Sequence, residues 1–291
     1  MSKKAIKKAI FPVAGLGTRF LPVTKASPKE MLPIVDKPLI QYAVEEAIAA
    51  GVEELIFVTS SAKRAIEDHF DRNFELEFSL KEKNKLKELE MIHDIVPSNV
   101  NIAYIRQTEA LGLGHAILCA KHLIGSEPFA VLLADDLIYH PKKNCLEQMV
   151  DAFHTNNTDG VLAIQAVKHS EVDQYGIVSL DEQQNVKTIV EKPRPENTAS
   201  NLAVVGRYIL PANIFSTIDT NHFGAGKEIQ LTDAIARLLS QQKIRGHIFE
   251  GQRYDCGSKL GYVQANIDYA LRHAYLGDVL SEWLKKRLSC A

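Results

Sequence analysis

Glycines and positive charges gather in the segment 11–34, which overlaps a short apolar run at 9–13. Glycine lets a backbone approach a ligand closely, and the N–H groups of such a loop can line an anion site. Arg19, Lys25 and Lys29 add positive charge within reach of the same loop. This combination predicts a site for a polyphosphate.

Two standard phosphate motifs are absent from this segment. The dinucleotide-binding pattern would require a third glycine where Phe20 stands, and the P-loop would require Gly-Lys-Ser/Thr after four intervening residues. We therefore expect a phosphate loop of a different kind.

Other polar side chains follow predicted strands further along the chain. Gln107 follows an apolar strand at 101–105, and Asp135 and Asp136 follow another at 129–133. Ligands of an open parallel sheet bind beyond the carboxyl ends of its strands, where the glycine loop would also lie. The convergence of a phosphate loop, an amide and two carboxylates is stronger evidence for a site than any one of these motifs.

The two carboxylates indicate a metal site. Mg²⁺ prefers oxygen ligands and typically uses one or two carboxylates together with substrate phosphates. Asp255 is a candidate for the second ligand, since it follows an apolar strand signal and precedes a predicted helix. An isolated Asp pair is more often a helix cap or a turn, but the position of Asp135 at the end of an apolar strand favours a ligand.

A second glycine loop lies at 112–115, just before a predicted helix. Beside Gln107 it could shape a flat slot for a base, because an amide offers both a donor and an acceptor to the N3–H and O4 edge of uracil. Considered alone, Gln107 is equally well explained as a surface amide. His115 is predicted to be structural.

Glu191 and Lys192 follow a predicted strand at 186–190. This pair suits a sugar phosphate, because a carboxylate accepts hydrogen bonds from hydroxyls and an ammonium binds the phosphate. Taken alone, the pair is better explained as a solvated charge pair before a turn, and Tyr175 and Gly176 as ordinary strand residues.

The elements that must position these residues alternate between strand and helix in the first half of the chain. Strands are predicted at 55–59, 101–105 and 129–133, and helices at 39–50, 62–70 and 114–123. Near-continuous apolar strands predict an α/β fold with a Rossmann-like, mainly parallel sheet and helices on both faces. Pro38 is expected at the first position of a helix. The Lys- and Glu-rich stretch 78–96 is expected to be a solvated helix with i,i+4 ion pairs.

The second half of the chain is richer in strands. They are predicted at 161–167, 176–180, 186–190 and 204–210, with helices at 230–240 and from 258 onward. We expect a single domain over 1–291. Its nucleotide-binding half would cover about 1–155, a β-rich sugar-binding half about 156–257, and C-terminal helices about 258–291.

Composition narrows the classes of protein that the chain can belong to. The 291 residues are 46% hydrophobic, which allows a sizeable core, and a net charge of −2 gives no overall field for nucleic acid or an anionic membrane. The segment that follows the N-terminal lysines is not expected to be a signal peptide, since it has neither a continuous apolar core nor a cleavage site. No apolar run is long enough to cross a bilayer. The cysteines form no zinc motif and suit a reducing compartment; they are Cys119, Cys145, Cys256 and Cys290. We expect a cytoplasmic protein with no nucleic-acid or membrane partner.

The glycine loop at 15–19, Gly-Leu-Gly-Thr-Arg, resembles the signature of the sugar-1-phosphate nucleotidyltransferases when it is taken together with Pro-Lys-Glu-Met-Leu-Pro at 28–33. The resemblance covers essentially the whole chain. Further stretches are similar to the bacterial subfamily that uses UTP and glucose 1-phosphate; they lie at 34–41, 112–116, 191–193 and 254–261.

This resemblance implies formation of UDP-glucose and pyrophosphate with Mg²⁺, in a homo-oligomer that would be a dimer or a tetramer. It implies base contacts from Ala14, Gly15, Gln107 and Gly112, with Glu30 also on the nucleotide side. It implies sugar-phosphate contacts from Gly176, Glu191 and Lys192, and metal ligation by Asp135 and Asp255. The implied catalytic residues are Arg19, Lys29, Asp135 and Lys192.

Three alternatives stay open. A thymidylyl or adenylyl transferase would use the same fold, although Gln107 suits uracil and thymine and disfavours purines. A metal-dependent glycosyltransferase also places aspartates at strand ends, but the Gly-Thr-Arg loop argues against it. A catalytically silent nucleotide sensor would be expected to lack the charged site residues that this chain retains.

Overall fold

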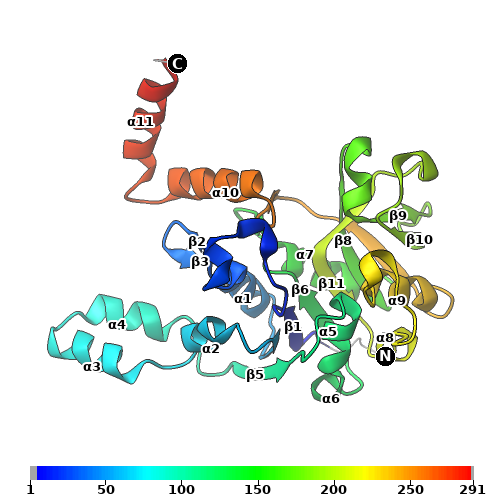
Figure 1. Ribbon diagram of the computed structural model, residues 1–291, viewed down its shortest axis with the longest axis horizontal. Helices are drawn as coiled ribbons and strands as arrows, with labels where there is room; N and C mark the ends of the chain where they lie inside the picture. Colours follow the sequence, from blue (N-terminus) through cyan, green and yellow to red (C-terminus); the bar gives the residue numbers. More distant parts are fainter. Residues whose placement is uncertain (1–4, 290–291) are drawn as a thin grey trace.

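A nine-stranded sheet runs through the centre of the protein in the computed structural model, which describes residues 5–289 (Figure 1). The first lysines and Cys290 lie outside the described residues. The strands of the first half are β1 (Lys8–Pro12), β4 (Glu54–Thr59), β5 (Asn101–Arg106) and β6 (Phe129–Leu132). Those of the second half are β8 (Gly160–Ala166), β9 (Gly176–Leu180), β10 (Val186–Glu191), β11 (Leu202–Leu210) and β12 (Ile244–Ile248).

The sheet has a parallel part and a part with antiparallel pairs. Strands β6, β1, β4 and β5 are neighbours in that order, and all three of their ladders are parallel. Strand β11 then pairs antiparallel with β6, β8 and β9. The predicted α/β class is confirmed, and the parallel strands send their carboxyl ends to one rim, where the candidate residues of the first half lie.

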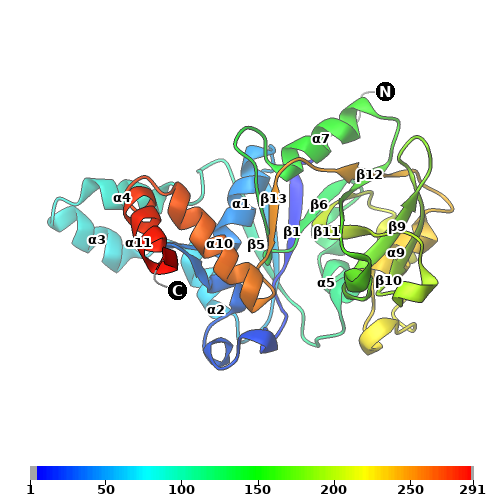
Figure 2. The same ribbon diagram turned by 90° about the horizontal axis from the view of Figure 1, so that it is seen from above.

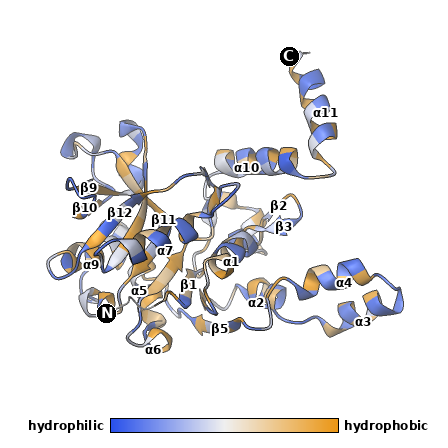
Figure 3. Ribbon diagram, turned by 180° about the vertical axis from the view of Figure 1, so that it is seen from behind, coloured by the Kyte–Doolittle hydropathy of each residue, from blue (hydrophilic) through white to orange (hydrophobic). Residues whose placement is uncertain are grey.

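Both faces of the parallel strands are buried. Successive side chains of a strand point to opposite faces, so each strand contributes to two core clusters. Phe11 and Phe57 belong to one core cluster, whereas Ile10 and Ile56 belong to the other. Helices α1 (Leu39–Ala49), α2 (Arg64–Phe70) and α7 (Cys145–Thr155) cover the first face. The second face is covered by α5 (Leu113–Cys119), α6 (Lys121–Ile124), α8 (Ile214–Thr217) and α9 (Leu231–Leu238). Figure 3 shows that hydrophobic residues line this centre.

Three local predictions were wrong. The helix predicted at 114–123 is divided into α5 and α6 at Ala120. Pro38 precedes α1 rather than opening it, because it lies in strand β3 (Lys37–Pro38), which pairs with β2 (Pro33–Ile34). The stretch 78–96 is not one helix but parts of two, α3 (Phe74–Glu82) and α4 (Leu86–His93). Asn84 has a φ of 53° between them, a left-handed conformation that asparagine tolerates and a helix cannot continue.

Two further features complete the fold. A ribbon of β7 (Asp136–Tyr139) and β13 (Gln252–Asp255) pairs antiparallel and brings the end of the second half back to the rim. Helices α10 (Lys259–Arg272) and α11 (Gly277–Ser289) then extend away from the sheet, as Figures 1 and 2 both show. Within residues 5–289, no helix is long and apolar enough to cross a membrane.

Candidate active site

A first hollow, with a volume of about 450 Å³, opens beyond the ends of β1 and β5. Four of the predicted base-contacting residues line it, namely Ala14, Gly15, Gln107 and Gly112. The loop after β1 supplies the first two, and the turn between β5 and α5 supplies the others. The structure therefore brings together residues that lie about ninety positions apart in the sequence.

The two glycines of this hollow are needed for different reasons. Gly112 has a φ of +103°, and a methyl group built on it would lie 2.9 Å from the Ile229 carbonyl oxygen, so only glycine fits. A methyl group built on Gly15 would meet no atom within 4 Å. The space beside Gly15 is therefore open to a ligand.

Gln107 is 7% exposed and is fixed by its own neighbours. Its side-chain Nε2 donates to the Gly112 carbonyl oxygen over 3.1 Å and lies 3.0 Å from His115 Nδ1. The sequence predicted that the amide would offer both a donor and an acceptor to a base. The geometry instead uses the donor side inside the protein.

A second hollow, of about 240 Å³, adjoins the first, since Leu113 lines both. It contains Gly176, Glu191 and Lys192, the three predicted sugar-phosphate residues. Gly176 and Glu191 face each other as register partners in the β9–β10 hairpin. Thr232, in the first turn of α9, donates a hydrogen bond to Glu191 Oε2 over 2.6 Å, and sequence reasoning missed it.

The backbone at Lys192 is strained. Its φ is 46°, which costs free energy in a residue other than glycine, and such conformations are concentrated at functional sites. The Lys192 N–H donates to the Tyr175 carbonyl oxygen over 2.9 Å, and this bond helps to hold the unusual conformation. The Lys192 side chain remains 48% exposed and lines the second hollow, so its ammonium is available to a ligand.

Asp135 and Lys29 form an ion pair at the edge of the second hollow, with 2.5 Å between Asp135 Oδ2 and Lys29 Nζ. Burial would raise the pKa of Asp135, but the Lys29 ammonium outweighs it and holds that pKa below its usual value. Burial also opposes the charge on Lys29, but the Asp135 and Glu30 carboxylates raise the pKa of Lys29. Both groups are therefore charged near neutral pH. Arg19 lines the same hollow and donates to the Gly257 carbonyl oxygen over 3.3 Å.

The neighbouring aspartates have different environments. Asp136 is paired with Arg253 and accepts a hydrogen bond from the Gly206 N–H over 3.1 Å. Both carboxylate oxygens of Asp136 therefore have partners within the protein, and Asp136 has a structural role at the rim. Arg253 was missed as a site residue, although it stands in the same short stretch as Asp255.

The β7–β13 ribbon delivers Asp255 to the rim, because Asp255 is the register partner of Asp136. A methyl group built on Gly257 would lie 3.0 Å from Asp135 Oδ2 and 3.0 Å from Asp255 Oδ1, so both carboxylates face the same small space. Burial, followed by the charge of Asp136, raises the pKa of Asp255. A cation between the two acids would relieve this crowding.

These donors fit Mg²⁺, which commonly takes one or two carboxylates from the protein and completes its shell with water and phosphate oxygens. Among the residues that the structure describes, no group of three or more His, Cys, Asp or Glu side chains could hold a metal ion. The arrangement therefore suits a metal that arrives with a phosphate ligand better than one in an all-protein cage.

Glu30 lines neither hollow. The family resemblance had implied that it lies on the nucleotide side. Its carboxylate is 2% exposed and lies 2.8 Å from the ammonium of Lys63, which is also buried. Burial raises the pKa of Glu30, although Lys29 and Lys63 oppose the shift. The Glu30–Lys63 pair anchors the short turn at Lys29–Met31 and so positions Lys29. No motif marked Lys63 in the sequence.

A second buried network supports Asp135 from behind. Arg207 of β11 is 1% exposed and forms an ion pair with Glu46 of α1, with 2.8 Å between nitrogen and oxygen. It also donates to the carbonyl oxygens of Leu133 over 2.9 Å and Asp136 over 2.8 Å. These carbonyls flank Asp135, so the guanidinium fixes the turn that presents this carboxylate. Sequence reasoning assigned Arg207 only to a strand.

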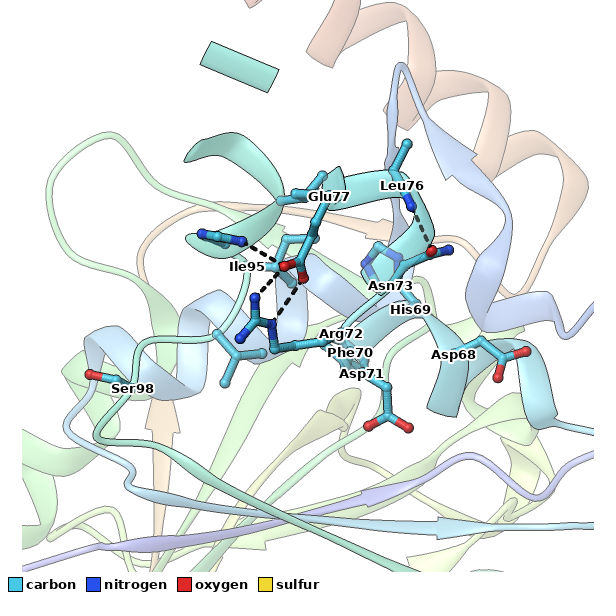
Figure 4. A pocket seen from close by; sticks show the side chains of 13 residues that line it. Asp68, His69, Phe70, Asp71, Arg72, Asn73, Leu76, Glu77, Ile95 and Ser98 are labelled. Carbon is cyan, nitrogen blue, oxygen red and sulfur yellow. Dashed lines mark hydrogen bonds and ion pairs between the residues drawn. The ribbon is translucent and has the colours of Figure 1, made fainter. Parts of the chain in front are cut away.

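A hollow of about 550 Å³, larger than either of these, lies far from the rim beside α2, α3 and α4. Figure 4 shows the Glu77 carboxylate inside it, joined by dashed lines to Arg72. His93 lies 3.2 Å from the same carboxylate. None of the predicted site residues lines this hollow.

Known proteins resemble this chain over nearly its whole length. Residues 8–271 match the nucleotidyl transferase family. The chain is 48% identical to a UTP–glucose-1-phosphate uridylyltransferase of Bacillus subtilis, over 98% of this chain and 99% of that protein.

Solved structures resemble the fold closely. A UDP-glucose pyrophosphorylase from Acinetobacter baumannii has a TM-score of 0.88 at 45% identity, covering 97% of this chain and 99% of that one. A structure described as a UTP-bound enzyme of the same name and organism has a TM-score of 0.87 at 46% identity, covering 96% of this chain and 98% of the other.

Proposed function

The chain belongs to the nucleotidyl transferase family, and we propose that it transfers the uridylyl group of UTP to glucose 1-phosphate, giving UDP-glucose and pyrophosphate. The observation that carries this proposal is the junction of the two hollows at Leu113, with Asp135 and Arg19 in the wall of the second. A nucleotide in the first hollow and a sugar phosphate in the second would meet beside these charged groups.

The reaction is a direct in-line displacement. A phosphate oxygen of glucose 1-phosphate attacks the α-phosphorus of UTP, a new P–O bond forms, and the bond to pyrophosphate breaks. The attacking group is already an anion, so no general base is needed. The main barrier is the approach of two anions, which positioned positive charges lower.

The positive side chains divide this task between the two substrates. Arg19 and Lys29 face the triphosphate, and Lys192 faces the phosphate of the sugar. The Asp135 carboxylate fixes the Lys29 ammonium, and the Glu30–Lys63 pair fixes the turn that carries it. Asp135 and Asp255 would hold Mg²⁺, which when bound neutralises charge on the reacting phosphates.

The remaining contacts decide which substrates fit. Ala14, Gly15, Gln107 and Gly112 surround the base. Glu191 accepts hydrogen bonds from glucose hydroxyls, with its second oxygen held by Thr232. The absence of a side chain at Gly176 leaves space in the sugar hollow, because a methyl group there would lie 3.3 Å from both Glu191 Oε2 and Thr232 Oγ1.

A thymidylyltransferase is the second candidate, since an acceptor on Gln107 suits the N3–H of thymine as well as that of uracil. The two activities separate in a matrix of UTP, dTTP, CTP and ATP against glucose 1-phosphate and galactose 1-phosphate, with pyrophosphate release as the readout. We expect the highest kcat/KM for UTP with glucose 1-phosphate. A higher value for dTTP would overturn the uridylyl assignment, and consumption of UDP-glucose without pyrophosphate would indicate a glycosyltransferase.

A homo-oligomer is also part of the proposal. Helices α10 and α11 extend from the sheet (Figure 2). Large apolar side chains on these helices and between them are exposed. These residues include Leu260 at 70%, Val263 at 50%, Tyr275 at 87%, Val279 at 71%, Trp283 at 57% and Leu288 at 74%. A second copy of the chain would cover them. Sedimentation equilibrium should give a dimer or a tetramer, and a monomer at micromolar concentration would contradict this part.

A further inference from the structure

Gln107 and His115 form a unit at the base-binding hollow that the proposed reaction does not by itself explain. Gln107 lies just beyond β5, and His115 lies in the first turn of α5. The Gln107 side chain is 7% exposed and lines the hollow with Ala14, Gly15 and Gly112. The orientation of its amide therefore decides which polar atom a base meets.

Two neighbours fix that orientation. The Gly112 carbonyl oxygen can only accept, so the atom 3.1 Å away must be Nε2 with its N–H. The same Nε2 lies 3.0 Å from His115 Nδ1. An amide nitrogen has no lone pair to offer, so His115 Nδ1 must accept and the imidazole must carry its proton on Nε2.

Both N–H bonds of the amide are then used inside the protein. Among residues 5–289, none is seen to donate a hydrogen bond to Gln107 Oε1, which leaves this oxygen for the ligand. Uracil presents an N–H at N3 and can donate to it. Cytosine presents a lone pair at N3, and two acceptors facing each other repel.

We propose that His115 is a positioning residue for base selection: it locks the Gln107 amide so that only its oxygen faces the base, which favours uracil over cytosine. This inference rests on the proposed function, since it concerns the same nucleotide hollow. Without the His115 acceptor, only the Gly112 carbonyl oxygen would oppose rotation of the amide. In the rotated orientation, the amide would present to the base an N–H that cytosine N3 can accept.

Two variants separate the lock from a merely structural role. In His115→Asn, the side-chain oxygen occupies nearly the position of Nδ1 and can accept the same hydrogen bond. In His115→Leu, the volume is similar and no acceptor remains. The measurement is kcat/KM for UTP and for CTP, each with saturating glucose 1-phosphate.

We expect His115→Leu to lower the UTP-to-CTP ratio of kcat/KM by roughly five- to tenfold, the effect of one lost hydrogen bond of about 1 kcal/mol. His115→Asn should keep the ratio within about twofold of the wild-type value. The KM for glucose 1-phosphate should not change in either variant. An unchanged ratio in His115→Leu, or an equal loss in both variants, would overturn the proposal.

A measurement on the wild-type protein covers the case in which a variant does not fold. Nitrogen NMR of labelled histidine should show the neutral His115 ring protonated at Nε2 and not at Nδ1. A proton on Nδ1 would overturn the lock. If the wild-type protein uses neither UTP nor CTP, the proposed function fails, whereas UTP use with the opposite tautomer removes only the role of His115.

Discussion

The rim that carries the candidate site and the hairpin of α3 and α4 both contain ion pairs around a hollow, yet they are built differently. At the rim, Lys29 pairs with Asp135 across 106 positions of sequence, and Glu30 with Lys63 across 33. In the hairpin, Glu77 pairs with Arg72 across only five positions, and Arg72 remains 77% exposed. The hairpin hollow is nevertheless larger than either of the two hollows at the rim.

Convergence of residues from distant segments, rather than cavity size, marks the site. Holding charged groups from distant segments in a partly buried place costs conformational entropy and desolvation, so it persists where the surrounding fold over-determines it. The Arg72–Glu77 pair joins residues only five positions apart and leaves Arg72 exposed, so it costs less to hold and needs no function. Substitutions at the rim should therefore have larger effects than matched substitutions in the hairpin.

The largest effect on stability is expected at Lys63. Lys63→Met leaves the Glu30 carboxylate buried without its ion-pair partner, which should lower the free energy of unfolding by about 3–5 kcal/mol in urea denaturation. Arg72→Met in the hairpin is the matched control and should shift the midpoint much less. The double variant Glu30→Gln/Lys63→Met should recover part of the loss. Equal midpoints for Lys63→Met and Arg72→Met would erase the contrast between the regions.

Lys192 should give the largest effect in the sugar half of the rim. Lys192→Ala removes an ammonium that faces the attacking phosphate, and we expect kcat/KM for glucose 1-phosphate to fall about a hundredfold. Lys168→Ala is the control, because Lys168 lies in the same half and its side chain is 82% exposed. The measurement is the initial rate at varied glucose 1-phosphate. If kcat/KM falls less than about threefold in Lys192→Ala, Lys192 does not contact the sugar phosphate.

Gly15 should give a smaller effect without a cost in stability. A methyl group at this position meets no protein atom within 4 Å, so Gly15→Ala should melt at the wild-type temperature. The same methyl group would occupy space that we assign to the base, so KM for UTP should rise roughly tenfold, equivalent to about 1.4 kcal/mol. An unchanged KM for UTP would show that the base lies elsewhere.

The smallest effect concerns the titration of Glu77 and Glu30, the carboxyl groups of the hairpin pair and the rim pair. The hydrogen bond from Arg72, opposed by desolvation, lowers the pKa of Glu77 from 4.5 to about 2, whereas burial raises the pKa of Glu30. The contribution of Glu77 to stability is thus present above its unfolded pKa and is lost as pH falls through about 2. That of Glu30 is greatest at low pH and declines as pH rises above its unfolded pKa. Carbon NMR of both side-chain carboxyls should show these opposite shifts, and shifts of the same sign would contradict the contrast.

Much of the rim could be predicted from sequence, because it rests on local patterns. The apolar runs of β1, β4 and β6 and the residues that follow them specify which side chains reach the carboxyl edge. The division of the chain into two halves and C-terminal helices stays a prediction. Helix α7 was missed, although Asn144 and Glu147 form a capping box that marks its start.

The parts that could not be predicted depend on pairing between distant segments. Asp255 reaches Asp135 only because β13 pairs with β7 in one register. Lys63 and Arg207 have no motif of their own, and His115 lies in the second glycine loop but was predicted only to be structural. The roles of all three follow from contacts that form after the sheet is assembled. Sequence pattern specifies strand ends, and tertiary packing decides which side chains meet there.

The most direct test of the central claim follows the α-phosphate of UTP. The protein is incubated with UTP labelled at that phosphate, with and without glucose 1-phosphate and Mg²⁺, beside Asp135→Asn and the hairpin control Glu77→Gln. We predict that the label moves to UDP-glucose only when the sugar phosphate is present, about a hundredfold more slowly in Asp135→Asn and at the wild-type rate in Glu77→Gln. Label released as UMP without glucose 1-phosphate, or transfer by Asp135→Asn near the wild-type rate, would contradict the account.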